Sequence, residues 1–526
     1  MADTEIQSFV NACATANIPV GEPDSYVLPP AVVIPVSAPF WQRAARVAQG
    51  CGLRWCSFWA SPVDESYELF CVLEKSGDYL VLRTRTGKEE PLPSQAPIYP
   101  AADRLERHAH DLLGIEFVDA PDSRRWTRHQ AWKEHEFPLR PDFIESLSQR
   151  GKTAADADYP FVRARGRGVV EIPVGPVHAG TIEPGHFRFQ AVGETVLNLE
   201  ERLGYVHKGI EKLAVGREPD SLVRLAGRVS GDSTVSHSWA ACQALERATA
   251  FEVPPRALCL RAIMAERERV ANHLGDIGAI CNDVGFAFGQ YQLTRLKETF
   301  VRTSHTIFGH RFMMDRVVPG GVSCDIDSAQ ITSMVQEAKG LTREAAEIVS
   351  MLEHSESLED RLMTTGRLTP EQADQLGVVG YVGRASGRGV DVRHDRPYAP
   401  YDRLKFAVPV YRAGDVAARA KIRADEIGTS LDLLCQLLQS VPEGPVKESF
   451  PDVKIACEGL GIVEGWRGEI LTYVQLDKDG TVTRFFPRDP SWLLWPALEL
   501  LVQDNIVPDF PVCNKSVNAS YSGHDL

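Results

Sequence analysis

Polar side chains that could transfer protons or hold an ion are concentrated around segment 228–233, which reads RVSGDS. Within it, Arg228 and Asp232 are charged, and Ser230 and Ser233 supply hydroxyl groups. Histidines precede and follow the segment. Histidine and aspartate are common general acids and bases near neutral pH. The candidate residues for a site that transfers protons or binds a ligand are therefore His178, His186, Arg228, Asp232 and His237.

Each candidate also has a purely structural explanation. His178 and His186 flank a loop rich in glycine and proline, GPVHAGTIEPG at 175–185, and could simply bond its backbone groups. Arg228 could neutralise Asp232 as a buried ion pair, because buried charges must be paired. The sequence leaves these alternatives open.

Five motifs follow one another in a fixed order in the second part of the chain. They are GPVHAGTIEPGHFRF at 175–189, RLGYVHKGIEKL at 202–213, RVSGDS at 228–233, SHSWAACQALE at 236–246 and NIVPDFPVCNKS at 505–516. Together they resemble the large subunit of nickel-iron hydrogenases of the membrane-bound, energy-converting type (group 4), and the 49 kDa subunit of respiratory complex I. Earlier, LERHAHDLLGI at 105–115 and PLRPDF at 138–143 resemble the 30 kDa subunit of complex I. A fusion of these two modules is the arrangement of formate hydrogenlyase large subunits.

The resemblance also identifies four positions where the hydrogenases carry thiolate ligands of a nickel-iron centre. Here these positions hold Ser230, Ser233, Cys513 and Ser516. Thiolate is a soft anion that suits nickel and iron, whereas a serine hydroxyl is hard and stays protonated at neutral pH. We therefore expect no nickel-iron centre. Ala519 replaces the residue at which hydrogenase precursors are trimmed, so residues 517–526 are expected to remain attached.

In complex I the corresponding cavity binds quinone between a histidine and a tyrosine. His178 matches that histidine, but Gly231 stands at the place of the tyrosine. Quinone is therefore a possible ligand that would need another proton donor. Arg467 matches an arginine that contacts the iron ligands in hydrogenases, and here it is expected to pair with a carboxylate.

The family resemblance implies partners as well. A small iron-sulfur subunit that holds a 4Fe-4S cluster, similar to the complex I 20 kDa subunit, would face His207, Lys208 and Glu211, and antiporter-like subunits would lie in the membrane. No cluster motif is visible in this chain, so no cofactor is expected to be held by it. The implied location is the cytoplasmic face of the inner membrane.

The chain is expected to have an α+β fold in two domains. An extension at 1–37 precedes a small α+β domain at 38–145, a polar linker at 146–158, and a large, mainly helical domain at 159–526 that begins with a small β-sheet. Alternating runs predict strands at 53–59, 67–74, 79–86, 169–174 and 187–192. Helices are predicted at 41–47, 103–113, 256–281 and 492–502.

Two helical predictions concern the site directly. The apolar residues Val196, Leu199, Leu203, Val206, Ile210 and Leu213 are spaced by three or four, which predicts a continuous helix carrying His207, Lys208 and Glu211. On the helix at 256–281, four polar residues share one face: Glu266, Arg269, His273 and Asp276. Such a face either meets water or supports a site.

Composition excludes several function classes. With 57 Lys and Arg against 71 Asp and Glu, the net charge of −14 disfavours nucleic-acid binding and a polybasic attachment to anionic lipid. No transmembrane run or secretory signal is visible. The 11 cysteines contain no Cys-x-x-Cys motif, which suits a reducing cytosol. The glycine-rich segment at 377–387 lacks the context of a nucleotide-binding loop, so nothing supports direct NADH binding.

The leading hypothesis is a peripheral subunit of a complex I-like, energy-converting-hydrogenase-related membrane complex that couples electron transfer to ion translocation. The alternatives are a quinone-reducing NADH-quinone oxidoreductase subunit and a scaffold without redox chemistry that docks partners or delivers a substrate such as CO2 or bicarbonate. The replaced ligands oppose an active hydrogenase. Whether the chain is itself catalytic stays open.

Overall fold

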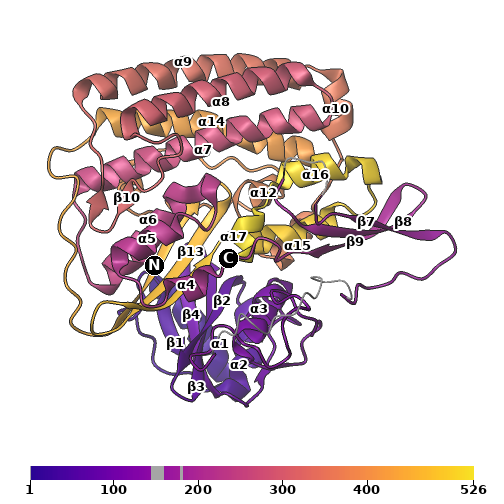
Figure 1. The fold of residues 1–526 in the computed structure, drawn as a ribbon, viewed down its shortest axis with the longest axis vertical. Helices are drawn as coiled ribbons and strands as arrows, with labels where there is room; N and C mark the ends of the chain where they lie inside the picture. The colour runs from indigo at the N-terminus through magenta and orange to yellow at the C-terminus, as the bar shows by residue number, and fades with distance from the viewer. Residues whose placement is uncertain (1, 144–158, 178–181) are drawn as a thin grey trace.

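The computed structural model describes residues 2–143, 159–177 and 182–526. Two layers of structure are visible in Figure 1: a small N-terminal α+β domain at the bottom, and a larger part whose long helices form the top. The predicted linker at 146–158 lies outside the described residues. One hydrophobic cluster runs through both parts, so the two domains share a core.

The N-terminal domain is built on a four-stranded sheet in the order β1-β4-β3-β2. Its elements are α1 (Ala2–Thr15), β1 (Val32–Pro35), α2 (Trp41–Gly50), β2 (Arg54–Val63), β3 (Ser66–Lys75), β4 (Asp78–Gly87), β5 (Leu92–Pro93), α3 (Asp103–Leu113) and β6 (Phe117–Val118). The predicted strands and helices are confirmed here. The segment expected to be an extension contributes β1, which pairs in parallel with β4.

An antiparallel three-stranded sheet opens the larger part and reaches out to the right in Figure 1. It consists of β7 (Val169–Val174), β8 (His186–Val192) and β9 (Thr195–Arg202). The predicted helix over 196–213 is wrong, because β9 occupies its first half and only α4 (Ile210–Ala214) is helical. Gly204 and Gly209 adopt φ of 92° and 71°, which a continuous right-handed helix does not allow.

A bundle of four long helices covers the top of the molecule. These are α7 (Pro255–Asp283), α8 (Ala287–Phe308), α9 (Ser328–Glu353) and α14 (Val416–Gln439) (Figure 1). The helix predicted at 256–281 corresponds to α7 and is confirmed. Its polar face is buried, so these charges must be compensated inside the protein.

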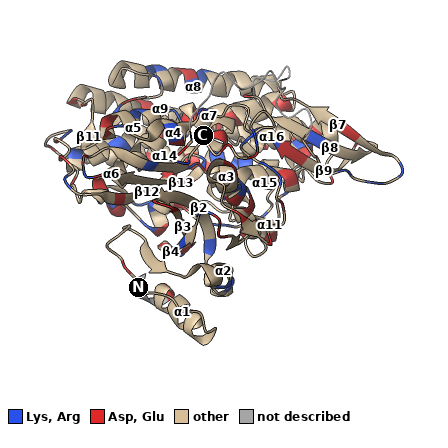
Figure 2. Ribbon diagram, turned by 60° about the horizontal axis from the view of Figure 1, so that its bottom comes forward, with Lys and Arg blue, Asp and Glu red and all other residues tan. Residues whose placement is uncertain are grey.

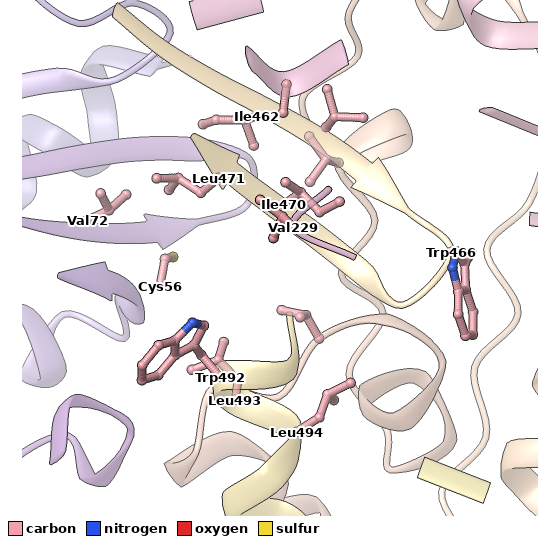
Figure 3. Close-up of a cluster of buried hydrophobic side chains, with 14 of the residues drawn as sticks. Cys56, Val72, Val229, Ile462, Trp466, Ile470, Leu471, Trp492, Leu493 and Leu494 are labelled. Carbon is pink, nitrogen blue, oxygen red and sulfur yellow. The ribbon is translucent and has the colours of Figure 1, made fainter. Parts of the chain in front are cut away.

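A second sheet, which the sequence patterns did not reveal, lies beneath the bundle: β12 (Cys457–Gly465), β13 (Gly468–Leu476) and β14 (Val482–Arg488). Helix α6 (Thr234–Ala248) packs on β12 so closely that a Cβ at Gly461 would come within 1.9 Å of the Ala240 carbonyl oxygen. Figure 3 shows Leu471 of β13 facing side chains of the N-terminal domain, and Trp492 below them.

The remaining helices and strands connect these layers. They are α5 (Pro219–Ala226), β10 (Val317–Val318), β11 (Gly321–Val322), α10 (Glu356–Leu362), α11 (Pro370–Gln375), α12 (Gly380–Ala385), α13 (Val392–Asp395), α15 (Ser491–Leu501), α16 (Phe510–Val517) and α17 (Tyr521–Asp525). The apolar run at 492–502 is a buried core helix, α15, as predicted. None of the helices in the described ranges has the length and apolarity needed to cross a bilayer. Figure 2 shows that acidic and basic residues are interspersed along the ribbon.

Candidate functional site

Segment 228–233 connects α5 to α6 and ends in a single turn of 3-10 helix at Gly231–Ser233. The C-terminal part of the chain folds back against it. The Ser230 hydroxyl lies 2.9 Å from the Ser520 hydroxyl, and the Arg467 guanidinium donates to the Asn518 carbonyl oxygen at 2.7 Å. The fold therefore brings segment 228–233 next to the residues that follow the motif at 505–516.

Asp232 is paired with Arg467, which lies in the turn between β12 and β13. Two nitrogens of Arg467 donate to the two carboxylate oxygens of Asp232 at 2.7 and 2.6 Å. Partial burial of Asp232 raises its pKa, but the charge and hydrogen bonds of Arg467 outweigh this and leave the pKa below its ordinary value. The expectation that Arg467 pairs with a carboxylate is confirmed.

Arg228, in contrast, does not pair with Asp232. It is exposed and forms an ion pair with Asp315, in which one nitrogen donates to the carboxylate at 2.8 Å. The prediction of a buried Arg228–Asp232 pair is therefore wrong. Arg228 and Asp232 are four residues apart, a spacing that suggests an ion pair. In the structure, the turn between them directs the two side chains to different neighbours.

Hydrogen bonds within the protein already engage the hydroxyls at the former ligand positions. The Ser230 hydroxyl donates to Asp232 at 2.7 Å, and the Ser233 hydroxyl lies 3.3 Å from an Arg467 nitrogen. On α16, Ser516 donates to the Cys513 carbonyl oxygen at 2.7 Å and accepts from Arg419 at 2.9 Å. These serines help to hold the fold.

Cys513 is the one thiol among the four positions. It is fully buried, and burial raises the pKa of its thiol to about 12, despite the nearby Arg419 guanidinium. One thiol and three hydroxyls do not supply the four soft, anionic sulfur donors that a nickel-iron centre requires. The residues present therefore do not fit that centre. In the parts of the chain that the structure describes, no three His, Cys, Asp or Glu side chains gather as a metal-binding group.

The three candidate histidines have different surroundings. His237 is completely buried, and its Nε2 lies 2.8 Å from the Asp489 carboxylate. Burial alone would raise the pKa of Asp489, but the interaction with His237 lowers it below its ordinary value. His186 is buried, with Nδ1 3.2 Å from the Gly175 carbonyl oxygen and Nε2 3.3 Å from Arg188. His178 lies outside the described residues.

The space beside Gly231, which the resemblance predicts to be the position of the complex I tyrosine, is open. A Cβ atom at Gly231 would have no heavy atom within 4 Å among the described residues, and the Asp232 side chain keeps 40% of its surface exposed. The Arg467–Asp232 pair therefore faces accessible space, and a larger side chain or a ligand could lie beside it.

Glu211 does not face a partner. It is buried between the domains, with one carboxylate oxygen 2.6 Å from His108 and the other 2.5 Å from Arg484. Burial raises the pKa of Glu211, but Arg484 and His108 lower it to about 2. His207 and Lys208 lie on the loop before α4 and stay candidates for a partner-facing surface.

Several residues that shape the site were not anticipated. Arg419 and Arg423 on α14 donate to Ser516, and Asn518 donates to Asp276 at 2.9 Å. Asp489 precedes α15 and holds His237. These contacts join segments separated by tens to hundreds of residues, so no local spacing indicates them. The pairing of buried charges is the general signal that could have directed a search for them.

Comparisons with known proteins agree with this architecture. Residues 35–148 match the family described as respiratory-chain NADH dehydrogenase, 30 Kd subunit; residues 208–275 match nickel-dependent hydrogenase; and residues 283–459 match respiratory-chain NADH dehydrogenase, 49 Kd subunit. The chain is 32% identical to formate hydrogenlyase subunit 5 of Escherichia coli over 85% of its own length and 79% of the relative.

Two further similar proteins come from respiratory or membrane-bound complexes. The fused C/D protein of the NADH-quinone oxidoreductase of Bacteroides fragilis is 29% identical over 82% of this chain and 85% of that protein. A chain from the membrane-bound sulfane sulfur reductase, described as an archaeal respiratory membrane complex, superposes with a TM-score of 0.65 at 26% identity, covering 69% of this chain and all of the other. The chain belongs to the family of group 4 hydrogenase-like large subunits that is shared with the fused 30 and 49 kDa subunits of complex I.

Proposed function

We propose that this chain is a subunit of a membrane-bound, complex I-like redox complex that couples electron transfer to ion translocation without a nickel-iron centre of its own. Membership in the family supports a peripheral subunit of a membrane redox complex. Electrons would reach the chain from a 4Fe-4S cluster in a small partner subunit, and their acceptor would bind next to segment 228–233.

One observation carries this proposal: the former ligand positions hold groups that are bonded to the protein. Ser230 and Ser516 make hydrogen bonds of 2.7 Å within the protein, and the carboxylate between the two serines of segment 228–233, Asp232, is neutralised by Arg467. Replacing such bonds by weak hydroxyl-metal contacts would cost free energy at each position. The arrangement instead provides a fixed cation-carboxylate pair beside open space.

Such a pair can do chemistry that needs no bound metal. Arg467 can donate hydrogen bonds to an acceptor molecule as negative charge develops on it, and the ionised Asp232 can take up a proton and pass it to that molecule. Both groups are held in place by neighbours, since Trp466 and Asn272 donate to the Asp232 carbonyl oxygen at 2.9 and 2.8 Å. The site is thus pre-organised.

The experiment is purification of the native complex from its host through a tag on this chain, followed by identification of its subunits. We expect a small subunit that shows the paramagnetic resonance of a reduced 4Fe-4S cluster, together with membrane subunits. Electron transfer through the complex should fall at least about tenfold in the Asp232→Asn variant, because the carboxylate exchanges the proton. Recovery of the chain without any iron-sulfur subunit would contradict the proposal.

A scaffold without redox chemistry is the second candidate. The two hydrogen bonds between Arg467 and Asp232 favour the scaffold, because a carboxylate that accepts a hydrogen bond at each oxygen can have a purely structural role. Simultaneous substitution of His178, Arg228 and Asp232 distinguishes the scaffold from the redox subunit. Normal assembly with unchanged electron transfer would favour the scaffold, whereas normal assembly with lost electron transfer would favour the redox subunit.

A further inference from the structure

An apolar pocket of about 240 Å³ lies at one end of the helical bundle, between α7, α9, α10 and α14. We call it the bundle-end pocket. Its walls include Ile277, Ile280, Val349, Leu352, Leu358 and Leu362. None of these residues belongs to the candidate site, so the pocket is a separate feature of the fold.

Small side chains on α14 create the pocket. Ala417, Ala420 and Ala424 recur at intervals of three and four residues and therefore lie on one face of the helix. A leucine at these positions would fill the space, as larger apolar residues do elsewhere in the core. The alanines leave room for about one large apolar side chain, since a cavity of roughly 150 Å³ accepts a benzene molecule.

Exposed apolar side chains lie at the pocket or next in sequence to residues that contact it. Met363 lines the pocket and is 47% exposed, and Met351, beside the lining residue Leu352, is 54% exposed. Helix α8 begins close by, because a Cβ at Gly289 would lie 2.9 Å from Leu352; its neighbour Phe288 is 49% exposed. Methionine and aromatic side chains are enriched at protein interfaces.

The charge next to the mouth is negative. On α10, Glu356, Glu359 and Asp360 are exposed and form no ion pair within the described ranges. Two nearby cations, Lys421 and Arg361, are already neutralised. Lys421 lies 2.6 Å from Glu353 and 3.5 Å from Asp425, and Arg361 lies 3.2 Å from Asp509.

We propose that the bundle-end pocket binds a helix of a partner protein, with one large apolar side chain in the pocket and flanking Lys or Arg residues paired with α10. An apolar groove with an acidic rim is the complement of a basic amphipathic helix. Anionic lipid would be repelled by the same carboxylates. This proposal does not depend on the chemistry at segment 228–233.

Filling the pocket tests the proposal without damaging the fold. The double variant Ala420→Leu with Ala424→Leu adds apolar volume where space exists, so its melting temperature should stay equal or rise. One partner should then be lost from the purified native complex by at least about tenfold, the loss typical of a blocked anchor side chain. The matched control is Ala329→Leu, on the exposed face of α9, which should leave the set of recovered subunits unchanged.

A charge-reversal variant and a photo-cross-link identify the molecule that occupies the bundle-end pocket. The variant Glu356→Lys, Glu359→Lys and Asp360→Lys should lose the same partner, and a photo-cross-linking amino acid at Met363 should attach to a peptide that combines apolar residues with Lys or Arg. A cross-link to lipid, to an acidic peptide or to a second copy of this chain would overturn the proposal. So would an unchanged set of subunits after the pocket is filled.

Discussion

Two regions of the molecule contain ion pairs between carboxylates and arginines, and the two regions differ in how far these pairs are buried. Beside the bundle, Arg393 of α13 lies 2.9 Å from Glu266 of α7 and 2.7 Å from Asp391, and all three are at most 2% exposed. At the candidate site, one cation, Arg467, and the Ser230 hydroxyl hold Asp232, whose side chain is 40% exposed. The bundle network fixes helices, whereas the site pair keeps one side open. A structural charge is enclosed by several partners, and a charge available for chemistry keeps access to solvent.

The largest effect is expected from breaking the enclosed network. In Arg393→Met, Glu266 and Asp391 lose a shared cation in a region without water, which costs about 3–5 kcal/mol of the free energy of unfolding. Urea unfolding followed by circular dichroism measures it. The exposed Arg403→Met is the control and should change the free energy by less than about 0.5 kcal/mol. A similar small change in Arg393→Met would show that the network is not structural.

A second enclosed carboxylate should make stability depend on pH. Burial raises the pKa of Glu469, but Arg54 and Arg488 lower it from its ordinary value of 4.5 to about 2. A lowered folded-state pKa contributes stability above pH 4.5 that is lost as the pH falls towards 2, up to about 3 kcal/mol.

The test is the difference in unfolding free energy between the native chain and Glu469→Gln. This difference should be largest at pH 7 and should shrink as the pH falls from 4.5 to 3. The exposed Glu134→Gln provides the control for losing one carboxylate. If the difference for Glu469→Gln did not change with pH, its pairing with Arg54 and Arg488 would not be what stabilises the interface between the domains.

Breaking the site pair should cost less than breaking the network. In Arg467→Met, Asp232 loses its cation but can be hydrated, so the free energy of unfolding should fall by about 1–2 kcal/mol. Adding Asp232→Asn should recover part of this loss, because no unpaired charge is left. A double-mutant cycle measures the coupling. A loss as large as that of Arg393→Met would place Asp232 among the enclosed charges.

The smallest effect is expected at Gly231. Since a Cβ there meets no neighbouring heavy atom, Gly231→Ala should change the free energy of unfolding by less than about 0.5 kcal/mol. The matched glycine is Gly366, which has a φ of 59° and where a Cβ would lie 2.7 Å from the Cys513 sulfur. Gly366→Ala should cost about 1–3 kcal/mol. Equal effects in thermal unfolding would show that the space beside Gly231 is not open.

The sequence predicted those features that depend on short-range patterns. Helix α3 has the predicted bounds because Gly114 adopts φ of 78° and ends it, and the pairing of β7 with β8 follows from their alternation. The prediction of a helix at 196–213 is wrong because apolar residues spaced by three and four also occur in a strand followed by a loop. Strands β12–β14 were missed, since strands buried on both faces lose the alternation that reveals a strand.

At the site, residue identities were predictable but partners were not. The serines at 230, 233 and 516 could be read from the motifs, and a carboxylate partner for Arg467 followed from its charge. The choice of Asp232, rather than another carboxylate, depends on bringing together segments more than 200 residues apart. For the same reason, the sequence offers Asp232, a nearby carboxylate in the chain, as a partner for Arg228, whereas the folded chain pairs Arg228 with Asp315.

The account depends on the claim that Ser230, Ser233, Cys513 and Ser516 do not hold nickel. Quantitative metal analysis of the intact complex, purified from cells grown with nickel, tests this most directly. We predict nickel far below one atom per chain, alongside iron in the amounts that the clusters of the partner subunits require. One nickel atom per chain, lost on substitution of Cys513, would contradict the account.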